Sequence, residues 1–336
     1  MEETLIEIIV CPECGAKFSF ENILRENGVI VSGDIKCSSC GKIYPIIKGI
    51  PRLLPESDRF DNYSKNFEHY LLRMDWHKAK RNKERFYELT GWEKGDLVGK
   101  DILDAGCGNG RWLVQFAEEG AGNIVGFDFT QAIERAVENC REFTGIHFLQ
   151  SDLFKMPFKD EYFDIVYCHG VLMMTPDPEK AVECLGKKVK PGGEIVLLVY
   201  RNLTPFQKFI DNCICGLTKR LPVKVIYYLS LIPTCIEYIP GAVPIFENIF
   251  HLSGQPSFML KHLHNFDWYS SSFRHRISPA QMLSWLEKGG FGNFKVLDTN
   301  DFRTRSRWSS VQKIKENLLE KGYFLKATLG VRAVKK

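Results

Sequence analysis

Short apolar runs alternate with amphipathic segments through the middle of the chain. The runs are typical of strands buried on both faces, and the segments between them, such as R-W-L-V-Q-F-A-E-E after Gly110, have helical spacing. Strands that alternate with helices predict an α/β fold with a doubly wound sheet, whose ligands bind at the carboxyl edge of the strands. The predicted strands are I-L-D, N-I-V-G-F-D-F-T, I-H-F-L-Q, F-D-I-V-Y-C-H-G-V-L and E-I-V-L-L-V-Y.

The glycine-rich stretch D-I-L-D-A-G-C-G-N-G joins the first predicted strand to the first helix. Gly106, Gly108 and Gly110 permit a tight turn that lets the backbone approach a ligand, and the helix N-terminus adds free N–H groups. A dinucleotide-binding fingerprint would place its third glycine where this chain has Arg111. Asp104 precedes the first glycine and is suited to holding a cationic ligand tail. The stretch therefore predicts a site for a nucleotide-like cofactor with a positively charged end.

This D-x-G-x-G-x-G pattern resembles motif I of the class I S-adenosylmethionine (SAM) dependent methyltransferases, and the K-P-G-G turn before the fifth strand strengthens the resemblance. Asp128 ends the second strand and is placed to bind ribose hydroxyls, with Phe129 against the adenine. Asp152 looks like the family's contact to the adenine amine, with the Leu153 backbone N–H on a ring nitrogen. The candidate SAM-binding residues are Asp104, Gly106, Cys107, Gly108, Asn109, Gly110, Asp128, Phe129, Asp152, Leu153 and His169.

The resemblance implies a Rossmann-like core over residues 100–202 and resumes at I-S-P-A-Q-M-L-S-W-L-E-K-G-G-F. We expect a helix there that begins at the N-cap Ser278 and ends at Gly289. The last two strands are expected at Asn293–Leu297 and Tyr323–Val334, giving a seven-stranded sheet with an antiparallel edge strand. Arg303–Lys321 is expected to form an additional helix.

The reaction implied by the resemblance is in-line attack by an oxygen, nitrogen or carbon atom of an acceptor on the sulfonium methyl group, producing S-adenosylhomocysteine. Positioning and desolvation can supply most of the catalysis, because SAM is already activated. Related enzymes with small-molecule acceptors often read G-V-L-H-H-T-P-D-P after the fourth strand, whereas Met173 and Met174 replace that histidine pair here. His169 and Tyr200 are the candidates for a catalytic base. A hydrogen-bonded histidine beside the cofactor is the alternative interpretation of His169.

Two cysteine turns, C-P-E-C-G and C-S-S-C-G, lie near the N-terminus. Two such turns about twenty residues apart supply four thiolates for a tetrahedral zinc ion, and the hairpin between them has too little core to fold without metal. The predicted ligands are Cys11, Cys14, Cys37 and Cys40. A thioredoxin-type redox site is disfavoured, because the chain has two cysteine pairs and no helical pattern follows them. The tail K-I-Y-P-I-I-K-G-I-P-R-L-L-P resembles the zinc-ribbon family that includes the small activator subunit of tRNA and protein methyltransferases, so we expect a structural zinc.

These motifs divide the chain into a zinc-ribbon module (1–55), a helical linker over the cofactor cleft (56–99), a SAM-binding core (100–202), a helical insertion (203–275) and the C-terminal part of the fold (276–336). Ser64–Thr90 in the linker carries a basic run, interpreted as a solvated helix face, with an RNA-facing patch as the alternative. The insertion is apolar, but Lys224, Glu237 and prolines interrupt it, which argues against a spanning helix. We expect a lid over the acceptor site; a homodimer contact and a peripheral membrane contact are the alternatives.

Composition narrows the function classes further. A formal net charge of +4 over 336 residues lacks the basic excess of a dedicated nucleic-acid-binding protein. The N-terminus does not read as a signal peptide, and the cysteines outside the two turns follow no disulfide framework, so a cytoplasmic protein is expected. No uncharged apolar run reaches the roughly twenty residues that a transmembrane helix needs.

The sequence therefore predicts a SAM-dependent methyltransferase that acts on a small-molecule or lipid-like acceptor. The alternative is a ribosomal or transfer RNA methyltransferase that uses the zinc ribbon for recognition. The chain lacks an N-P-P-Y-type motif for a flipped base and a separate RNA-binding module, which disfavours that alternative. A third class, a methyltransferase-like scaffold without activity, conflicts with the intact acidic residues and glycines of the cofactor motifs.

Overall fold

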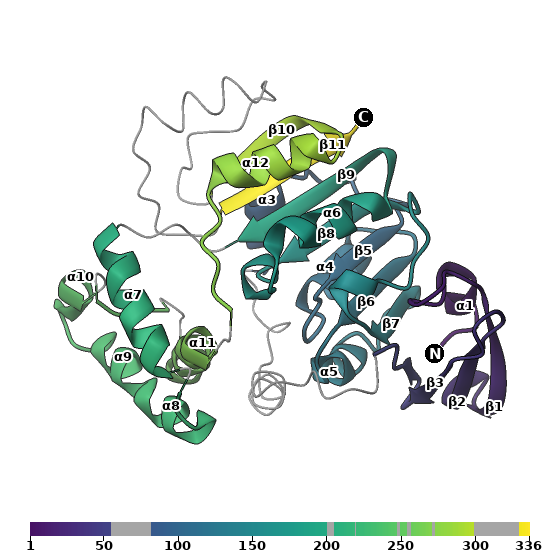
Figure 1. The fold of residues 1–336 in the computed structure, drawn as a ribbon, viewed down its shortest axis with the longest axis horizontal. Coiled ribbons are helices and arrows are strands. Elements are labelled where there is room, and N and C mark those ends of the chain that lie inside the picture. Colours follow the sequence, from purple (N-terminus) through teal and green to yellow (C-terminus); the bar gives the residue numbers. More distant parts are fainter. Residues whose placement is uncertain are drawn as a thin grey trace.

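The computed structural model describes residues 1–54, 82–199, 205–218, 220–246, 249–253, 257–270, 273–298 and 329–336. It contains a small antiparallel sheet, a seven-stranded sheet flanked by helices, and a group of inserted helices (Figure 1). The expected helix at Arg303–Lys321, the candidate base Tyr200 and the linker before residue 82 lie outside the described residues.

The large sheet confirms the predicted α/β fold class. Its strands, in spatial order, are β10 (Phe291–Asp298), β11 (Leu329–Lys335), β9 (Val189–Val199), β8 (Phe163–His169), β5 (Ile102–Ala105), β6 (Ile124–Asp128) and β7 (Ile146–Gln150). Neighbouring strands from β9 to β7 are parallel, and β11 is antiparallel to both β9 and β10. The antiparallel strand is therefore the second one in, between β9 and the edge strand β10.

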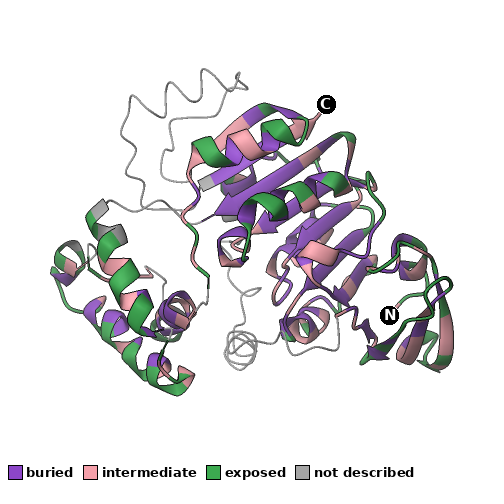
Figure 2. Cartoon of the chain, in the orientation of Figure 1, coloured by how far each residue is buried: buried purple, intermediate pink, exposed green. Residues whose placement is uncertain are grey.

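Both faces of this sheet are covered, which explains why its strands read as continuous apolar runs. Successive residues point to opposite faces, so Leu103, Val125 and Val166 belong to one core and Ile102, Ile124 and Ile165 to the other. Helices α6 (Pro178–Lys188) and α12 (Pro279–Lys288) pack on the first face. Helices α3 (Asn82–Thr90), α4 (Arg111–Glu118) and α5 (Ala132–Asn139) pack on the second. Figure 2 shows the buried strands between these partly exposed helices.

The helix predicted at Ser278 begins with a capping box. The Ser278 hydroxyl accepts a hydrogen bond from the Gln281 backbone N–H at 3.2 Å, while the Gln281 side chain accepts from the Ser278 backbone at 3.0 Å. Pro279 occupies the first turn and Gly289 ends the helix, as the sequence predicts.

The N-terminal module joins the large sheet at its β7 edge. It consists of helix α1 (Leu5–Ile8) and strands β1 (Phe18–Glu26), β2 (Val29–Cys37), β3 (Ile43–Ile47) and β4 (Ile50–Pro51). The Leu53 backbone N–H donates to the Gln150 carbonyl at 2.8 Å, and the Val10 N–H donates to the Pro157 carbonyl at 2.8 Å. One apolar cluster runs from α1 and β2 into the first face of the large sheet. The module thus covers an edge strand that would otherwise present unpaired backbone groups.

The insertion forms a separate group of helices. They are α7 (Pro205–Thr218), α8 (Val223–Leu229), α9 (Leu231–Ile236), α10 (Ala242–Phe246) and α11 (Phe258–Ser270). Ile226, Phe266, Trp268 and Tyr269 make its buried core, so the aromatic stretch F-D-W-Y-S mainly packs within the insertion. The chain returns to the large sheet through His275, whose backbone N–H donates to the Met173 carbonyl at 2.9 Å.

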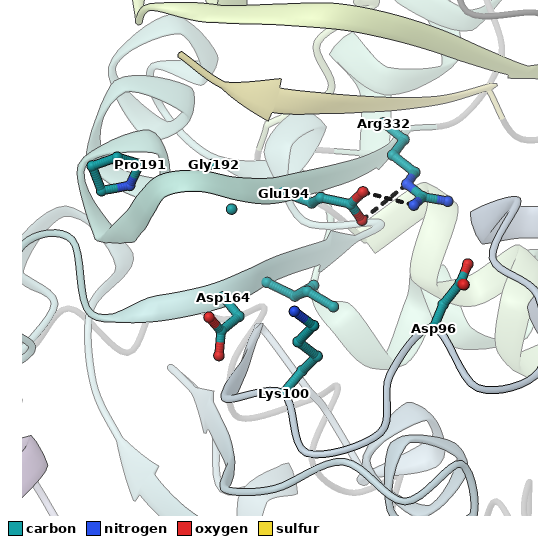
Figure 3. A pocket seen from close by; sticks show the side chains of 9 residues that line it. Asp96, Lys100, Asp164, Pro191, Gly192, Glu194 and Arg332 are labelled. Atoms are coloured by element: carbon teal, nitrogen blue, oxygen red, sulfur yellow. Dashed lines mark hydrogen bonds and ion pairs between the residues drawn. The ribbon is translucent and has the colours of Figure 1, made fainter.

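An ion pair between Arg332 and Glu194 lies at the amino-terminal edge of the sheet. The Arg332 guanidinium donates to both carboxylate oxygens of Glu194, at 2.6 and 2.9 Å, and to the Gly91 carbonyl at 3.1 Å. Arg332 and Glu194 border a pocket of about 340 Å³ that Lys100 and Asp164 also line (Figure 3). The pocket lies at the edge of the sheet opposite the one where parallel sheets bind ligands. We therefore interpret the Arg332–Glu194 ion pair as a structural contact.

No described helix combines the length and the apolar character that crossing a membrane requires.

Candidate cofactor site and metal centre

The four predicted cysteine ligands come together in the N-terminal module. Their sulfur atoms all lie within 4.8 Å of one another, with 3.7 Å between Cys11 and Cys40 and 3.4 Å between Cys14 and Cys37. Tetrahedral zinc with Zn–S bonds near 2.3 Å would separate its sulfurs by about 3.8 Å. The cluster therefore fits a structural zinc ion bound by four thiolates.

The two cysteine turns have the same backbone geometry. Gly15 and Gly41 follow them with φ angles of +74° and +71°, and their N–H groups donate to the carbonyls of Cys11 and Cys37. Such φ angles strain other residues, which explains a glycine after each turn. Burial raises the pKa of Cys37, but hydrogen bonds from the backbone of Cys40 and Ser39 outweigh it and bring the value to about 6. This favours the thiolate form of Cys37, the form that binds zinc. In the metal-free cluster, a backbone hydrogen bond from Lys42 lowers the pKa of Cys40, but burial and the neighbouring cysteine side chains outweigh it and raise the value to about 11.

The glycine turn after β5 is held closely by its surroundings. A Cβ atom on Gly106 would lie 2.3 Å from Cγ2 of Val171, and one on Gly110 would lie 3.0 Å from Cβ of Ala136. At Gly108, which has a φ of +55°, a Cβ atom would meet nothing within 4 Å. The outer two glycines are thus needed for packing, while the middle one leaves open space beside the turn.

Asp104, the next-to-last residue of β5, is a buried carboxylate with an unsatisfied oxygen. It is 1% exposed, and its Oδ2 atom has no hydrogen-bond partner. Burial, together with the nearby charge of Asp128, raises its pKa well above the ordinary value. An unpaired buried carboxylate is costly, and a cationic group beside it would restore its charged form. The residues at this turn therefore fit a cofactor with a cationic end, as SAM has.

Asp128 lies next to this turn and is fixed by the protein. Its Oδ2 atom accepts from the Gly108 N–H at 2.8 Å, and its Oδ1 atom accepts from the Thr130 N–H and hydroxyl at 2.8 and 2.7 Å. Burial raises the pKa of Asp128 despite these donors. Its contact to a ribose stays a prediction, but strand pairing places it at the same carboxyl edge as Asp104.

The acidic residue after β7 is held by a short helical turn. Asp152 precedes the 3₁₀ turn η2 (Leu153–Lys155), and its Oδ1 atom accepts from the Phe154 N–H at 2.9 Å. Leu153 is buried, so its side chain packs in the core while its backbone stays beside Asp152. The structure therefore places these residues at the predicted strand end, and their contacts to adenine stay predictions.

The N-terminal module reaches this edge through Arg52. The Arg52 guanidinium donates to the Gln150 side-chain oxygen at 3.1 Å and pairs with Glu134 on α5 at 2.7 Å. The Gln150 amide in turn donates to the Phe129 carbonyl at 2.9 Å. The segment that follows the ribbon thus helps to hold the loop that carries the predicted adenine contact.

His169 ends β8 and is bound by an aromatic neighbour. The Trp112 indole N–H donates to its Nδ1 atom at 2.9 Å, and the two rings stack with centroids 5.7 Å apart. An indole N–H can only donate, so Nδ1 must accept and the proton of the neutral imidazole lies on Nε2. In this arrangement neither nitrogen is ready to take a proton from an acceptor, which favours a positioning role over that of a base.

The structure brings most candidate cofactor residues to one edge and shows others that the sequence pattern missed. Cys107 and Asn109 are buried at the turn, and the Asn109 carbonyl accepts from Asn139 on α5 at 2.9 Å. Trp112, Gln150 and Arg52 were not predicted as site residues. Only Trp112 carries a signal in the sequence, since it lies two residues after Gly110, whereas the other two act through contacts between distant segments.

Comparison with known families agrees with both predicted resemblances. A family model described as a methyltransferase domain matches residues 97–228, and one described as a Trm112p-like protein matches residues 2–49. The chain therefore carries a methyltransferase domain preceded by a Trm112-like zinc-ribbon domain.

Curated relatives belong to two acceptor classes. A tRNA U34 carboxymethyltransferase of Nautilia profundicola is 34% identical over 104 residues, covering 30% of this chain and 35% of the relative. A demethylmenaquinone methyltransferase of Lactococcus lactis subsp. lactis is 34% identical over 109 residues, covering 31% and 43%. The Staphylococcus haemolyticus enzyme of that name is 26% identical over 203 residues, covering 59% and 71%. The chain thus spans less than half the length of the first two relatives.

Similar solved structures include a complex of the Haloferax volcanii Trm112 methyltransferase activator with a methyltransferase. It covers 81% of this chain and 97% of that chain, with 17% identity and a TM-score of 0.44. A SAM-dependent methyltransferase of Mesorhizobium loti covers 77% and 100%, with 18% identity and a TM-score of 0.45.

Replacing one cysteine ligand tests the metal centre. Cys14→Ser removes a thiolate from the cluster, so we expect loss of bound zinc and a lower melting temperature, because the small module depends on the metal. Metal analysis of the purified protein should find one zinc ion per chain before the substitution and less afterwards. Cys213→Ser changes another exposed cysteine, in the insertion, and should keep the zinc. Wild-type protein purified without any zinc would contradict the assignment.

Asp104→Asn tests the buried carboxylate through stability. Because burial raises the pKa of Asp104, the folded chain holds this proton more tightly than the unfolded chain does. The carboxyl therefore lowers stability increasingly as pH rises above the unfolded value near 4, by linkage. We expect the ligand-free variant to melt at a higher temperature than wild type at neutral pH, with a difference that shrinks toward pH of about 4.

The same variant should bind SAM more weakly. A hydrogen bond to a charged group contributes about 1.5 to 3 kcal/mol, which is roughly a 10- to 150-fold change in dissociation constant. Equilibrium dialysis measures the constant. Asp160→Asn alters an exposed aspartate and should leave it unchanged. Equal SAM affinity of wild type and Asp104→Asn would rule out the assigned contact.

Proposed function

We propose that the chain is a SAM-dependent methyltransferase that transfers a methyl group to a small-molecule or lipid-like acceptor. The observation that carries the proposal is the unsatisfied Asp104 carboxylate beside the glycine turn, within the matched methyltransferase domain. The set of glycines and of strand-end carboxylates supports an active cofactor site over a scaffold role.

Each part of the chain has a task in this proposal. The ribbon (1–55) supports the β7 edge, the core (100–202) binds the cofactor, and the insertion (203–275) covers the acceptor. Asp104 faces the amino-acid end of SAM, Asp128 binds the ribose, and Asp152 with the Leu153 backbone and Phe129 binds the adenine. Bound SAM supplies an activated methyl group on a sulfonium centre. The protein contributes orientation and exclusion of water.

The acceptor side is apolar where it meets the insertion. Met173 in the 3₁₀ turn η3 (Leu172–Met174) is buried after β8, and Met174 is half-buried. The Met173 carbonyl binds the segment that returns from the insertion, which ties the two parts together. Methionines adapt their shape to apolar surfaces and offer no strong hydrogen bonds. This lining supports an apolar acceptor over a highly charged one.

An RNA acceptor is the second candidate. The relatives named tRNA U34 carboxymethyltransferase support it, as does the Trm112-like domain, whose family includes activators of tRNA methyltransferases. The modest net charge of +4 weighs against a large RNA footprint on the chain alone. The demethylmenaquinone methyltransferases among the relatives support the lipid-like acceptor.

Transfer of labelled methyl groups from SAM tests the proposed acceptor class. Wild-type protein is incubated with host extract, and the products are separated into lipid, small-molecule, protein and RNA fractions. We expect label in the lipid or small-molecule fraction, and strongly reduced label with Asp104→Asn. Label found only in RNA would contradict the first choice and favour the second candidate.

His169 is tested by comparing it with Trp112. If His169 positions neighbouring groups through the indole, His169→Asn and Trp112→Phe should lower kcat by similar factors below about tenfold. Loss of a general base would lower kcat about 10²- to 10⁴-fold. It would also remove the pH dependence that the base gives to the wild-type rate. A large loss for His169→Asn together with normal activity of Trp112→Phe would restore the catalytic-base assignment.

A further inference from the structure

Helices α8 and α9, together with the turn that follows α9, expose a stripe of large apolar side chains between Tyr228 and Ile239. Tyr228 on α8, Ile232 on α9, and Tyr238 and Ile239 in the turn after α9 are 67%, 50%, 52% and 56% exposed. Buried Ile226 lies on the opposite side, toward α11. In Figure 1, α8 and α9 lie on the outer side of the insertion, with α11 between them and the large sheet. Most of the exposed large apolar residues in the described chain belong to this insertion.

The charges of the insertion are arranged to match an anionic surface. Among the described side chains of residues 205–273, the exposed charged ones are Arg220 and Lys224, both close to the start of the stripe. Two of the described acidic side chains are paired with basic partners. Glu237 is 2% exposed and pairs with Lys261 at 2.6 Å, and Asp211 pairs with Arg276. The exposed face therefore combines apolar and aromatic groups with basic charge.

We propose that this stripe, which we call the α8–α9 face, binds the surface of a membrane that contains anionic lipids. Helices that lie in a membrane interface have this composition, with aromatic and aliphatic residues on one face and lysine or arginine near the headgroups. Contiguous apolar surface of this kind is rare on proteins that meet only water. None of the described helices is both long enough and apolar enough to cross a bilayer.

This surface would bring the enzyme to the phase in which an apolar acceptor resides. Membrane binding itself does not require methyl transfer, so it can be measured without a known acceptor. If the methyl-transfer experiment failed, the vesicle result would be unchanged. If the protein did not bind vesicles, the methyl-transfer result would likewise be unchanged.

Vesicle flotation tests the inference with the full chain. The probes are vesicles of equal parts phosphatidylglycerol and phosphatidylcholine, and vesicles of phosphatidylcholine alone. We expect wild type to float with the anionic vesicles and to bind neutral ones more weakly. The variant Tyr228→Ser/Ile232→Ser/Ile239→Ser should bind at least about tenfold more weakly, because it loses apolar area that enters the interface. Arg220→Glu/Lys224→Glu should abolish the preference for anionic lipid.

A matched control separates loss of the surface from loss of the fold. Leu24→Ser/Ile43→Ser removes apolar side chains of similar exposure from the ribbon, 55% and 53%, and should float like wild type. Wild type that stays in solution with anionic vesicles would overturn the inference, as would equal flotation of the triple variant. A concentration-dependent dimer in sedimentation velocity, disrupted by the triple variant and accompanied by no flotation, would assign the face to a second copy instead.

Discussion

The buried carboxylate at the end of β5 is the constraint on which the rest of the site depends. Asp104 lies beneath the glycine turn, with an unsatisfied oxygen and a second buried carboxylate nearby. Gly106 lies so close to Val171 that a larger residue would not fit at this position of the turn. A folded protein retains such an arrangement when a ligand benefits from it, because the lone charge is costly. A cationic nucleoside cofactor is the simplest partner for this turn.

The zinc-ribbon module also supports the predicted cofactor site. Its zinc ligands lie far from the glycine turn in the sequence, yet the segment after them pairs with the edge of β7 through Leu53. Arg52 continues this contact to Gln150, whose amide holds the loop of Phe129. The metal therefore stabilises a module that completes an edge of the methyltransferase sheet. This explains physically how a ribbon without catalytic groups can support a cofactor site.

Local patterns were sufficient for the sheet, the zinc ligands and the capping of α12, because each depends on residues close in sequence. The pattern predicts that the last two strands form an antiparallel edge, whereas the order of β11 inside β10 depends on long-range packing. The hydrogen bond from Trp112 to His169 joins α4 to β8, so no local pattern predicts that it fixes the imidazole tautomer. The exposed stripe of α8 and α9 was recognised as apolar, but only the helices reveal which side chains face outward.

Calorimetric titration of SAM into the zinc-bound protein tests the central claim, that Asp104 holds the cationic end of the cofactor. Repeating the titration in buffers of different ionisation enthalpy counts the protons exchanged on binding. Because burial raises the pKa of Asp104 in the ligand-free chain, a cation beside it should drive proton release. We predict binding of one SAM per chain, with proton release that is lost in Asp104→Asn. Absence of SAM binding, or identical proton exchange in both proteins, would contradict the account.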